Sequence, residues 1–205
     1  MGKLFCILGK SGVGKNALFD RIIADRDINI KPVTPYTTRP MRENETNGIQ
    51  YHFVSESEMR EMEVRNEIIE KREYSTVRGV WHYFTVRFTA AFDENHIIIT
   101  TPHAIPQFIE SVGAKNIVIV LLLADDKTRL ERSISRESRE ATPNYAEVCR
   151  RYLADEKDFQ QMSRYFANDK DSLSEWGSVQ KFVIDTVCDL ETCVSQFKSI
   201  LNKIR

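Results

Sequence analysis

A glycine-rich run near the N-terminus carries the clearest chemistry in the sequence. Gly9-Lys10-Ser11-Gly12-Val13-Gly14-Lys15 fits the pattern G-x-x-x-x-G-K, in which glycines let successive backbone N–H groups turn toward a polyphosphate. Lys15 would add a cation beside the β and γ phosphates, and a following helix would direct its positive end at the same anion. We therefore predict a nucleotide-binding loop in preference to a structural glycine turn. Its members are Gly9, Ser11, Gly12, Val13, Gly14, Lys15 and Asn16.

The residue after the loop lysine departs from the usual pattern. Asn16 stands where Ser or Thr normally coordinates Mg²⁺. An amide oxygen can still bind magnesium, directly or through water, but it is a poorer ligand, and Ala17 offers no hydroxyl in its place. We expect a weak Mg²⁺ site at Asn16 and unimpaired phosphate binding.

A second polar segment has residue types that suit a monophosphate. Arg39 and Arg42 lie in a loop-forming stretch, with Glu45 and Tyr51 nearby. Two guanidinium groups and a phenol hydroxyl could hold a dianionic phosphate. The alternative is a solvated loop in which the arginines pair with Glu43 and Glu45.

A third cationic group is predicted on a helix that runs from residue 126 to about residue 139. Its arginines recur at i, i+3, i+7 and i+10 and therefore share one helix face. Like charges repel at this spacing, so an anion in front of them would explain the pattern; the alternative is a solvated helix neutralised by its glutamates. The arginines are Arg129, Arg132, Arg136 and Arg139, and the glutamates are Glu131, Glu137 and Glu140.

Composition limits the classes of protein to consider. The chain has 205 residues, 41% of them hydrophobic, and a net charge of −1. This suits one compact domain and gives no global attraction to nucleic acid or anionic lipid. The four cysteines show no C-x-x-C spacing, and we expect them to be reduced thiols. No apolar run is long enough to span a bilayer. We expect a cytoplasmic protein, monomeric or homodimeric, with no membrane or nucleic-acid partner.

The elements that must position these groups alternate between buried strands and helices. Apolar runs at residues 4–8, 97–101, 117–123 and 181–184 predict strands buried on both faces. Helical spacing is found at residues 16–24, 55–65, 106–112, 126–139, 145–165 and 190–204, and a short helix is expected at 88–93. Residues 51–54, 67–74 and 80–86 have strand character. The pattern predicts an α/β fold with a parallel sheet.

The polar segment also resembles a known family. Residues 37–54 contain every fixed position of T-T-R-x-x-R-x-x-E-x-x-G-x-x-Y-x-F-V, the acceptor segment of the guanylate kinases, and residues 11–15 match the family's S-G-V-G-K. The resemblance implies a P-loop NTPase fold, with a parallel-sheet core, helices on both faces, an inserted monophosphate-binding lobe and a helical lid. It implies a single guanylate kinase-like domain over 1–205. The core would comprise 1–32, 86–125 and 150–205, the lobe 33–85 and the lid 126–149.

The resemblance also implies roles for individual residues. Arg39, Arg42 and Tyr51 would hold the acceptor phosphate, with Glu45 supporting the arginines. Asn66 to Glu70 is similar to the family's N-x-F-I-E, so Glu70 would accept hydrogen bonds from guanine. Tyr83-Phe84-Thr85 is similar to its Y-G-T/S, which makes Tyr83 a phosphate ligand and Thr85 a base or phosphate contact. The groups implied in catalysis are Lys15, Arg39, Arg132, Arg136 and Arg151. Arg150 could correspond to the family's later arginine as well as Arg151 does.

Three features of the family are missing. Its strand ending D-I-D-x-Q-G is replaced by residues 97–104, so one acid near Mg²⁺ and another near guanine are absent, and Pro35 replaces a base-contacting hydroxyl. His103 could substitute at this point, although a loop histidine without a catalytic role is the simpler interpretation. The lid has Arg136-Glu137-Ser138-Arg139 in place of R-G-T-E.

Together these residues predict phosphoryl transfer from ATP, with Mg²⁺, to a nucleoside monophosphate, and GMP is the favoured acceptor. One alternative is a non-catalytic guanylate kinase-like binding module, which the missing acids would suit. Another is a P-loop kinase for a different phosphorylated small molecule. Retention of Lys15 and the whole glycine loop favours an enzyme.

Overall fold

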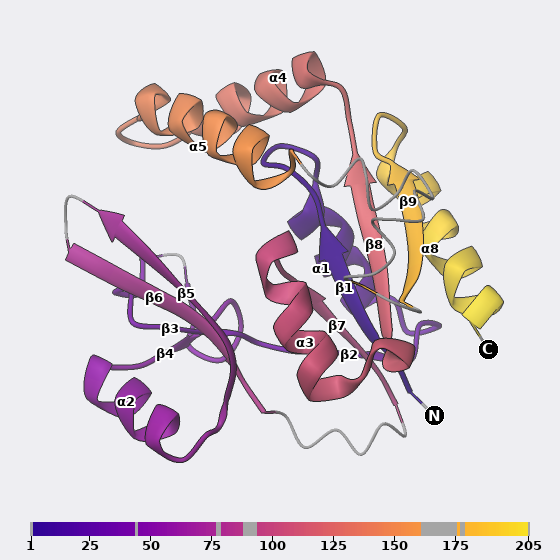
Figure 1. Cartoon of the computed structure of the whole chain (residues 1–205). Helices are drawn as coiled ribbons and strands as arrows, with labels where there is room; N and C mark the ends of the chain where they lie inside the picture. Colours follow the sequence, from indigo (N-terminus) through magenta and orange to yellow (C-terminus); the bar gives the residue numbers. More distant parts are fainter. Residues whose placement is uncertain are drawn as a thin grey trace.

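The computed structural model describes residues 2–43, 45–76, 79–87, 94–160, 176 and 179–204. It has a central layered core, a smaller lobe to one side and two long helices above both (Figure 1). The short helix expected at residues 88–93 lies outside the described residues, as does the end of the helix expected to reach residue 165.

The core is built on a parallel sheet, as the buried apolar runs predict. The strand order is β2-β7-β1-β8-β9, and every neighbouring pair is parallel. The strands are β1 (Leu4–Leu8), β2 (Ile30–Pro32), β7 (Asn95–Ile99), β8 (Ile117–Leu123) and β9 (Gln180–Asp185). β7 begins and ends two residues earlier than expected, so Thr100 and Thr101 follow the strand instead of belonging to it.

Helices cover both faces of this sheet, which confirms the predicted fold class. α1 (Lys15–Ala24) and α8 (Leu190–Ile204) pack on one face, and α3 (Ile105–Val112) packs on the other (Figure 1). The alternation of β1 explains this arrangement, because Phe5 and Ile7 join the first apolar cluster while Leu4, Cys6 and Leu8 join the second. Two short 3₁₀ helices, η1 (Pro102–Ala104) and η2 (Ala114–Asn116), flank α3. No helix in the described ranges has the length and apolarity needed to cross a membrane.

The smaller lobe contains a second sheet with the strand order β4-β3-β6-β5. Its strands are β3 (Tyr36–Thr37), β4 (His52–Phe53), β5 (Ile68–Thr76) and β6 (Gly79–Val86), and its helix is α2 (Glu56–Val64). α2 begins at a capping box, in which the Ser55 hydroxyl accepts from the backbone N–H of Glu58 and the Glu58 carboxylate accepts from the N–H of Ser55. The long β5–β6 hairpin forms the wall of the lobe nearest the lid helices (Figure 1).

Two helices form the layer above the core and the lobe. α4 (Asp126–Glu137) and α5 (Tyr145–Asp158) are capped by the Asp125 and Asn144 side chains and pack against each other. The boundary expected between lid and core at residues 149 and 150 falls inside α5, which is continuous. Because a helix moves as one unit, we propose that the lid extends to Asp158.

Candidate active site

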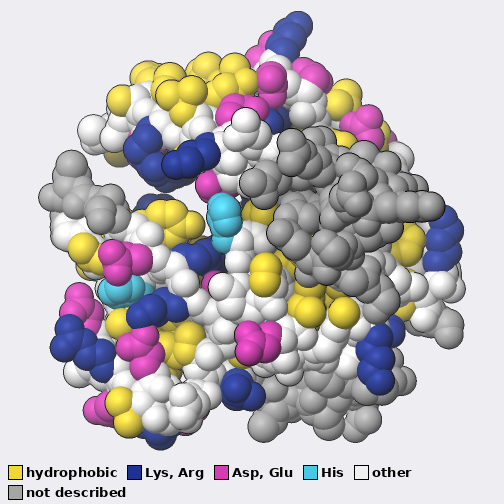
Figure 2. Space-filling model, in the orientation of Figure 1, with side chains coloured by type: hydrophobic (Ala, Val, Ile, Leu, Met, Phe, Trp, Pro, Cys, Tyr) yellow, Lys and Arg dark blue, Asp and Glu magenta, His cyan; other side chains and the backbone are white. Residues whose placement is uncertain are grey.

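An open cleft of about 1620 Å³ separates the phosphate loop, the smaller lobe and the lid helices. Its volume exceeds the roughly 300–1000 Å³ of one small-molecule site, so it has room for two substrates. Lys and Arg side chains gather below α4 and α5 at its margin (Figure 2). The predicted site residues that line it are Gly9, Ser11, Gly12, Gly14, Lys15, Asn16, Arg39, Arg42, Tyr51, Tyr83, Arg132, Arg136 and Arg151. The predicted residues that do not line it are Val13, Glu45, Glu70 and Thr85.

The glycine-rich loop has the strand–loop–helix setting that phosphate binding requires. It follows β1 directly, and α1 begins at Lys15. Gly12 has a φ of 83°, and a Cβ there would lie 2.4 Å from the backbone oxygen of Arg129. Only glycine fits this approach between the loop and α4. Val13 points into the apolar core instead of the cleft and can offer a ligand only its backbone.

The Lys15 ammonium is held inside the loop. It donates to the backbone oxygens of Gly9 at 2.6 Å and Lys10 at 3.2 Å. Burial lowers its pKa to about 8, the Asp155 carboxylate acts against this, and nearby arginines lower the pKa further. A polyphosphate in the cleft would form the ion pair that this amine does not have among the described residues.

Arg39 is a buried and fully paired group on the acceptor side. Its side chain is 4% exposed, and it forms a bidentate pair with Glu45, with N–O distances of 2.7 and 2.9 Å. Its Nε donates to the Tyr83 hydroxyl at 3.2 Å, and its guanidinium lies 5.6 Å from the centre of the Tyr51 ring. The hydrogen bonds from Arg39 hold the pKa of Glu45 below its ordinary value. Glu45 is therefore placed to orient Arg39, while the exposed Arg42 borders the cleft.

The carboxylate expected to meet guanine does not line the cleft and is covered by Arg72. Glu70 is 3% exposed and is paired with Arg72 and with the Thr85 hydroxyl. Thr85, expected to contact the base or a phosphate, does not line the cleft either, and its hydroxyl donates to Glu70. Arg72 lines the cleft in place of Glu70, and the sequence analysis missed it. Strand alternation could have found it, because residues i and i+2 of a strand share one face.

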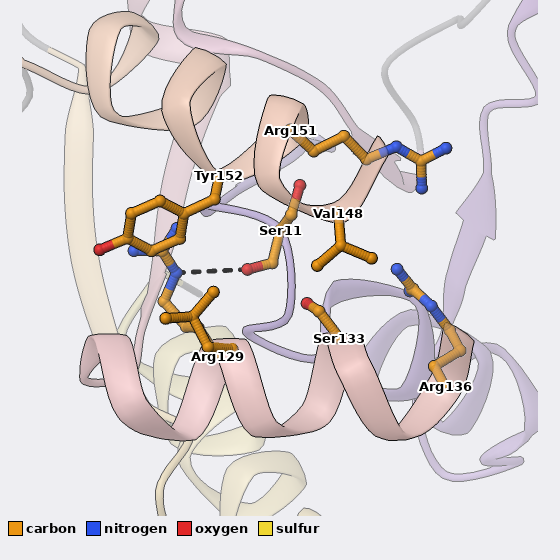
Figure 3. A pocket seen from close by; sticks show the side chains of 8 residues that line it. Ser11, Arg129, Ser133, Arg136, Val148, Arg151 and Tyr152 are labelled. Carbon is orange, nitrogen blue, oxygen red and sulfur yellow. Dashed lines mark hydrogen bonds between the residues drawn. The ribbon is translucent and has the colours of Figure 1, made fainter. Parts of the chain in front are cut away.

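The row of arginines on α4 does not act as one unit. Arg129 is 2% exposed and points toward the phosphate loop, where its Nε donates to the backbone oxygen of Ser11 at 3.2 Å (Figure 3). Arg136 from α4 and Arg151 from α5 project to the opposite side of the small cavity shown in Figure 3, toward the cleft. Arg132 also lines the cleft, whereas Arg139 does not and lies beyond the end of α4, which stops at Glu137, short of the residue 139 expected. Arg129 is thus a structural residue, and Arg132, Arg136 and Arg151 remain candidates for contacts with nucleotide phosphates.

A cluster of acids fixes Arg129, and the sequence analysis did not anticipate it. Asp126 lies 2.7 Å, Glu156 3.1 Å and Asp155 3.7 Å from the guanidinium nitrogens. Asp155 also accepts from the Ser11 N–H at 2.6 Å, and Glu156 pairs with Lys10 at 2.6 Å. α4, α5 and the phosphate loop are therefore joined through charged side chains.

The tip of β7 presents hydroxyls where the family has acids. The side-chain oxygens of Thr100 and Thr101 are buried, line the cleft and have no hydrogen-bond partner among the described residues. His103 is exposed, with its Nε2 lying 3.5 Å from Asp158. The described residues contain no group of three or more His, Cys, Asp or Glu side chains that could hold a metal. The neutral oxygens of Asn16 and these threonines fit Mg²⁺ only as an ion bound mainly by nucleotide phosphates.

Comparison with known proteins gives one consistent family. The family model described as "Guanylate kinase" matches residues 1–167. The guanylate kinase of Malacoplasma penetrans is 40% identical over 74 residues, which are 36% of this chain and 38% of that protein. The guanylate kinase of Neisseria gonorrhoeae is 36% identical over 81 residues, which are 40% of this chain and 38% of that protein. The chain thus matches well under half of the length of either relative.

A solved structure extends the likeness to the fold. The crystal structure of guanylate kinase from Anaplasma phagocytophilum matches 98% of this chain and 85% of that chain, with a TM-score of 0.59 and 17% identity. At this identity the match concerns the fold alone. It agrees with the core of parallel strands described above.

Proposed function

Because the chain belongs to the guanylate kinase family, we propose that it transfers the γ-phosphoryl group of ATP to a nucleoside monophosphate, with GMP as the favoured acceptor. One observation carries the proposal. Lys15 of the phosphate loop, Arg39 of the smaller lobe and the lid arginines Arg132, Arg136 and Arg151 all line a single cleft. A donor and an acceptor bound there would both face cationic side chains.

The chemistry needs no nucleophile from the protein. A phosphate oxygen of the acceptor attacks the γ-phosphorus of ATP, and the bond to the β–γ bridging oxygen breaks, which leaves ADP. Catalysis then consists of alignment and charge stabilisation. Lys15 would hold the donor phosphates, and Arg39, oriented by Glu45 and Tyr83, would hold the acceptor phosphate. Mg²⁺ brought with ATP would neutralise charge on the donor phosphates.

The lid would complete the site when both substrates are bound. The Arg136 guanidinium makes no hydrogen bond or ion pair within the described part of the chain, so it is available to a phosphate. Arg151 shares Glu147 with Arg150, at 2.8 and 2.6 Å, and could exchange this partner for a phosphate oxygen. Closure of α4 and α5 over the cleft would also exclude water and prevent hydrolysis of ATP.

The setting that we infer is cytoplasmic. All four cysteines are free thiols, which suits a reducing compartment, and the proposed substrates are cytoplasmic nucleotides. A monomer or a homodimer remains the expected state.

The test is ADP formation from ATP and Mg²⁺ with GMP, dGMP, AMP, CMP, UMP and IMP in turn. We expect turnover with GMP and a loss of at least about 10²-fold in Lys15→Ala, because a cation is removed from the transferring group. Lys127→Ala is the matched control, because Lys127 is an exposed lid residue that does not line the cleft. Binding of ATP or GMP without transfer to any acceptor would contradict the proposal and favour a non-catalytic binding module.

One observation favours a second candidate function. Glu70, the acid expected to select guanine, is covered by Arg72 and does not line the cleft. This would suit a kinase whose acceptor is a different phosphorylated small molecule. Turnover with another acceptor in the same assay, and none with GMP, would support this candidate.

A further inference from the structure

The wall formed by β5 and β6 presents a guanidinium to the cleft in front of a hidden carboxylate. Arg72 Nε donates to Glu70 Oε2 at 3.0 Å, and Arg72 Nη2 donates to Glu70 Oε1 at 3.3 Å. The same Oε1 accepts from the Thr85 hydroxyl at 2.8 Å. The Glu70 side chain is 1% exposed, whereas that of Arg72 is 21% exposed. Both carboxylate oxygens are therefore engaged, and the cleft meets Arg72.

The arrangement fixes what this wall can offer to a ligand. Arg72 uses Nε and Nη2 to bind Glu70, and Nη1 makes no hydrogen bond within the described part of the chain. A guanidinium has only donors and a carboxylate only acceptors. The wall therefore offers N–H donors to atoms that accept hydrogen bonds, with Glu70 balancing the charge from behind.

Aromatic side chains surround the guanidinium. Tyr74 follows Arg72 on the same face of β5, and Tyr83 and Trp81 are the cross-strand partners of Arg72 and Tyr74. All four side chains line the cleft. Aromatic rings next to the N–H donors of a guanidinium suit a planar heterocycle that stacks on a ring and is hydrogen-bonded along one edge.

We propose that Arg72 recognises the base of the acceptor nucleotide through guanine O6 and N7, and that Glu70 is a positioning residue that acts by orienting Arg72. The proposal rests on the proposed function and assigns a residue to its acceptor site. Guanine presents O6 and N7 as adjacent acceptors, and arginine binds this pair with two parallel hydrogen bonds. Adenine places an amino donor where guanine has O6, so it would meet the guanidinium unfavourably. A carboxylate would instead bind the N1–H and the 2-amino group.

The two modes of recognition can be separated with the wild-type protein and base analogues. IMP lacks the 2-amino group but keeps O6 and N7, whereas 7-deaza-GMP keeps the amino group and lacks N7. By isothermal titration calorimetry we expect IMP to bind within about threefold of GMP and 7-deaza-GMP to bind about tenfold more weakly, because one of two hydrogen bonds to the guanidinium is lost. The proposal would be overturned if IMP bound tenfold or more weakly than GMP while 7-deaza-GMP bound with the same affinity as GMP.

Variants supply an independent test. Arg72→Gln should weaken the binding of GMP roughly 5- to 150-fold, the range for a bidentate arginine–guanine contact. It should also remove the preference for GMP over 7-deaza-GMP and leave the affinity for ATP unchanged. Glu70→Gln keeps an oxygen acceptor for Arg72, so it should weaken the binding of GMP less and preserve the ratio of the affinities for GMP and IMP. Unchanged GMP affinity in Arg72→Gln, together with loss of that affinity in Glu70→Gln, would show that the carboxylate binds the base. If the wild-type protein bound no monophosphate, the proposed function itself would be refuted and this inference with it.

Discussion

Arg129→Met offers the sharpest test of how the lid is joined to the phosphate loop. Methionine has a similar length and lacks the charge, so the substitution removes the guanidinium from a site that is 2% exposed. The donors to Ser11, Asp126 and Glu156 are lost together. Breaking a fully buried ion pair typically costs about 3–5 kcal/mol.

Because the acids around Arg129 are partly exposed to solvent, we expect the loss in the free energy of unfolding to lie below that range. The Asp126 and Glu156 side chains are 60% and 40% exposed, and water can solvate them after the change. Only Asp155, at 17%, is left in a poorly solvated position, and it keeps the Ser11 N–H. We therefore expect the free energy of unfolding to fall by about 2–3 kcal/mol, which for a chain of this size lowers Tm by roughly 4–12 °C.

The measurement is thermal and urea denaturation without nucleotide, with Arg136→Met as a matched control. Arg136 occupies the same helix but is exposed, so its loss should change stability by less than about 1 kcal/mol. In the transfer assay Arg136→Met should be the more damaging of the two variants. Its kcat/KM should fall about 10²-fold, because a cation facing the phosphates is gone. Adding Asp155→Asn to Arg129→Met should restore part of the stability, because the unpaired charge is removed. Equal stability losses in the two arginine variants, or a Tm within about 2 °C of wild type in Arg129→Met, would refute this reasoning.

Three further predictions concern other parts of the chain. Gly12→Ala would force a Cβ to within 2.4 Å of a backbone oxygen at a φ of 83°, so urea denaturation should show a loss of about 2–4 kcal/mol. Gly14→Ala, at a φ of 95° with nothing within 4 Å, should lose only about 1–2 kcal/mol, and equal losses would count against the packing argument. Ser55→Ala removes the capping hydroxyl of α2 and should cost about 1 kcal/mol by thermal denaturation, with kcat/KM unchanged because Ser55 does not line the cleft. Hydrogen bonds from Arg150 and Arg151 lower the pKa of Glu147 from 4.5 to about 2. The charged carboxylate therefore stabilises the fold above pH 4.5, and this contribution is lost as the pH falls toward 2. The difference in urea midpoint between wild type and Glu147→Gln should shrink over that interval, and a constant difference would disprove the assignment.

Local patterns in the sequence predict most of the secondary structure correctly. The apolar run at β8 fixes both ends of the strand, and α8 begins and ends where its apolar periodicity does. Two short strands, β2 and β3, are not predicted at all, and the other errors occur at the ends of elements, where the local pattern is weakest. β7 ends at Ile99, and the extended Thr101 is already the N-cap of η1, which begins at Pro102, so an apolar and β-branched run alone overestimates the strand.

The residues of the candidate site could be predicted from the sequence, but the contacts between their side chains could not. The sequence places a cation at Lys15 and arginines on the acceptor loop, and these do line the cleft. It cannot show that Arg129 faces the loop while Arg136 faces the cleft, because both lie on one helix face and differ only in what packs against them. Whether Glu70 or Arg72 lines the cleft depends in the same way on the β5–β6 register.

The sequence by itself determined the fold class, the phosphate loop and the family, because each of these is encoded in short-range spacing: a buried strand, a glycine run, a helix, and the fixed positions between Thr37 and Val54. Tertiary structure alone decided which charged groups remain available to a ligand. A charged side chain is free only if no opposite charge reaches it. The partners of Arg129 and Arg39 range from neighbouring residues to others more than forty positions away. Whether such partners meet depends on long-range packing, which no local pattern specifies.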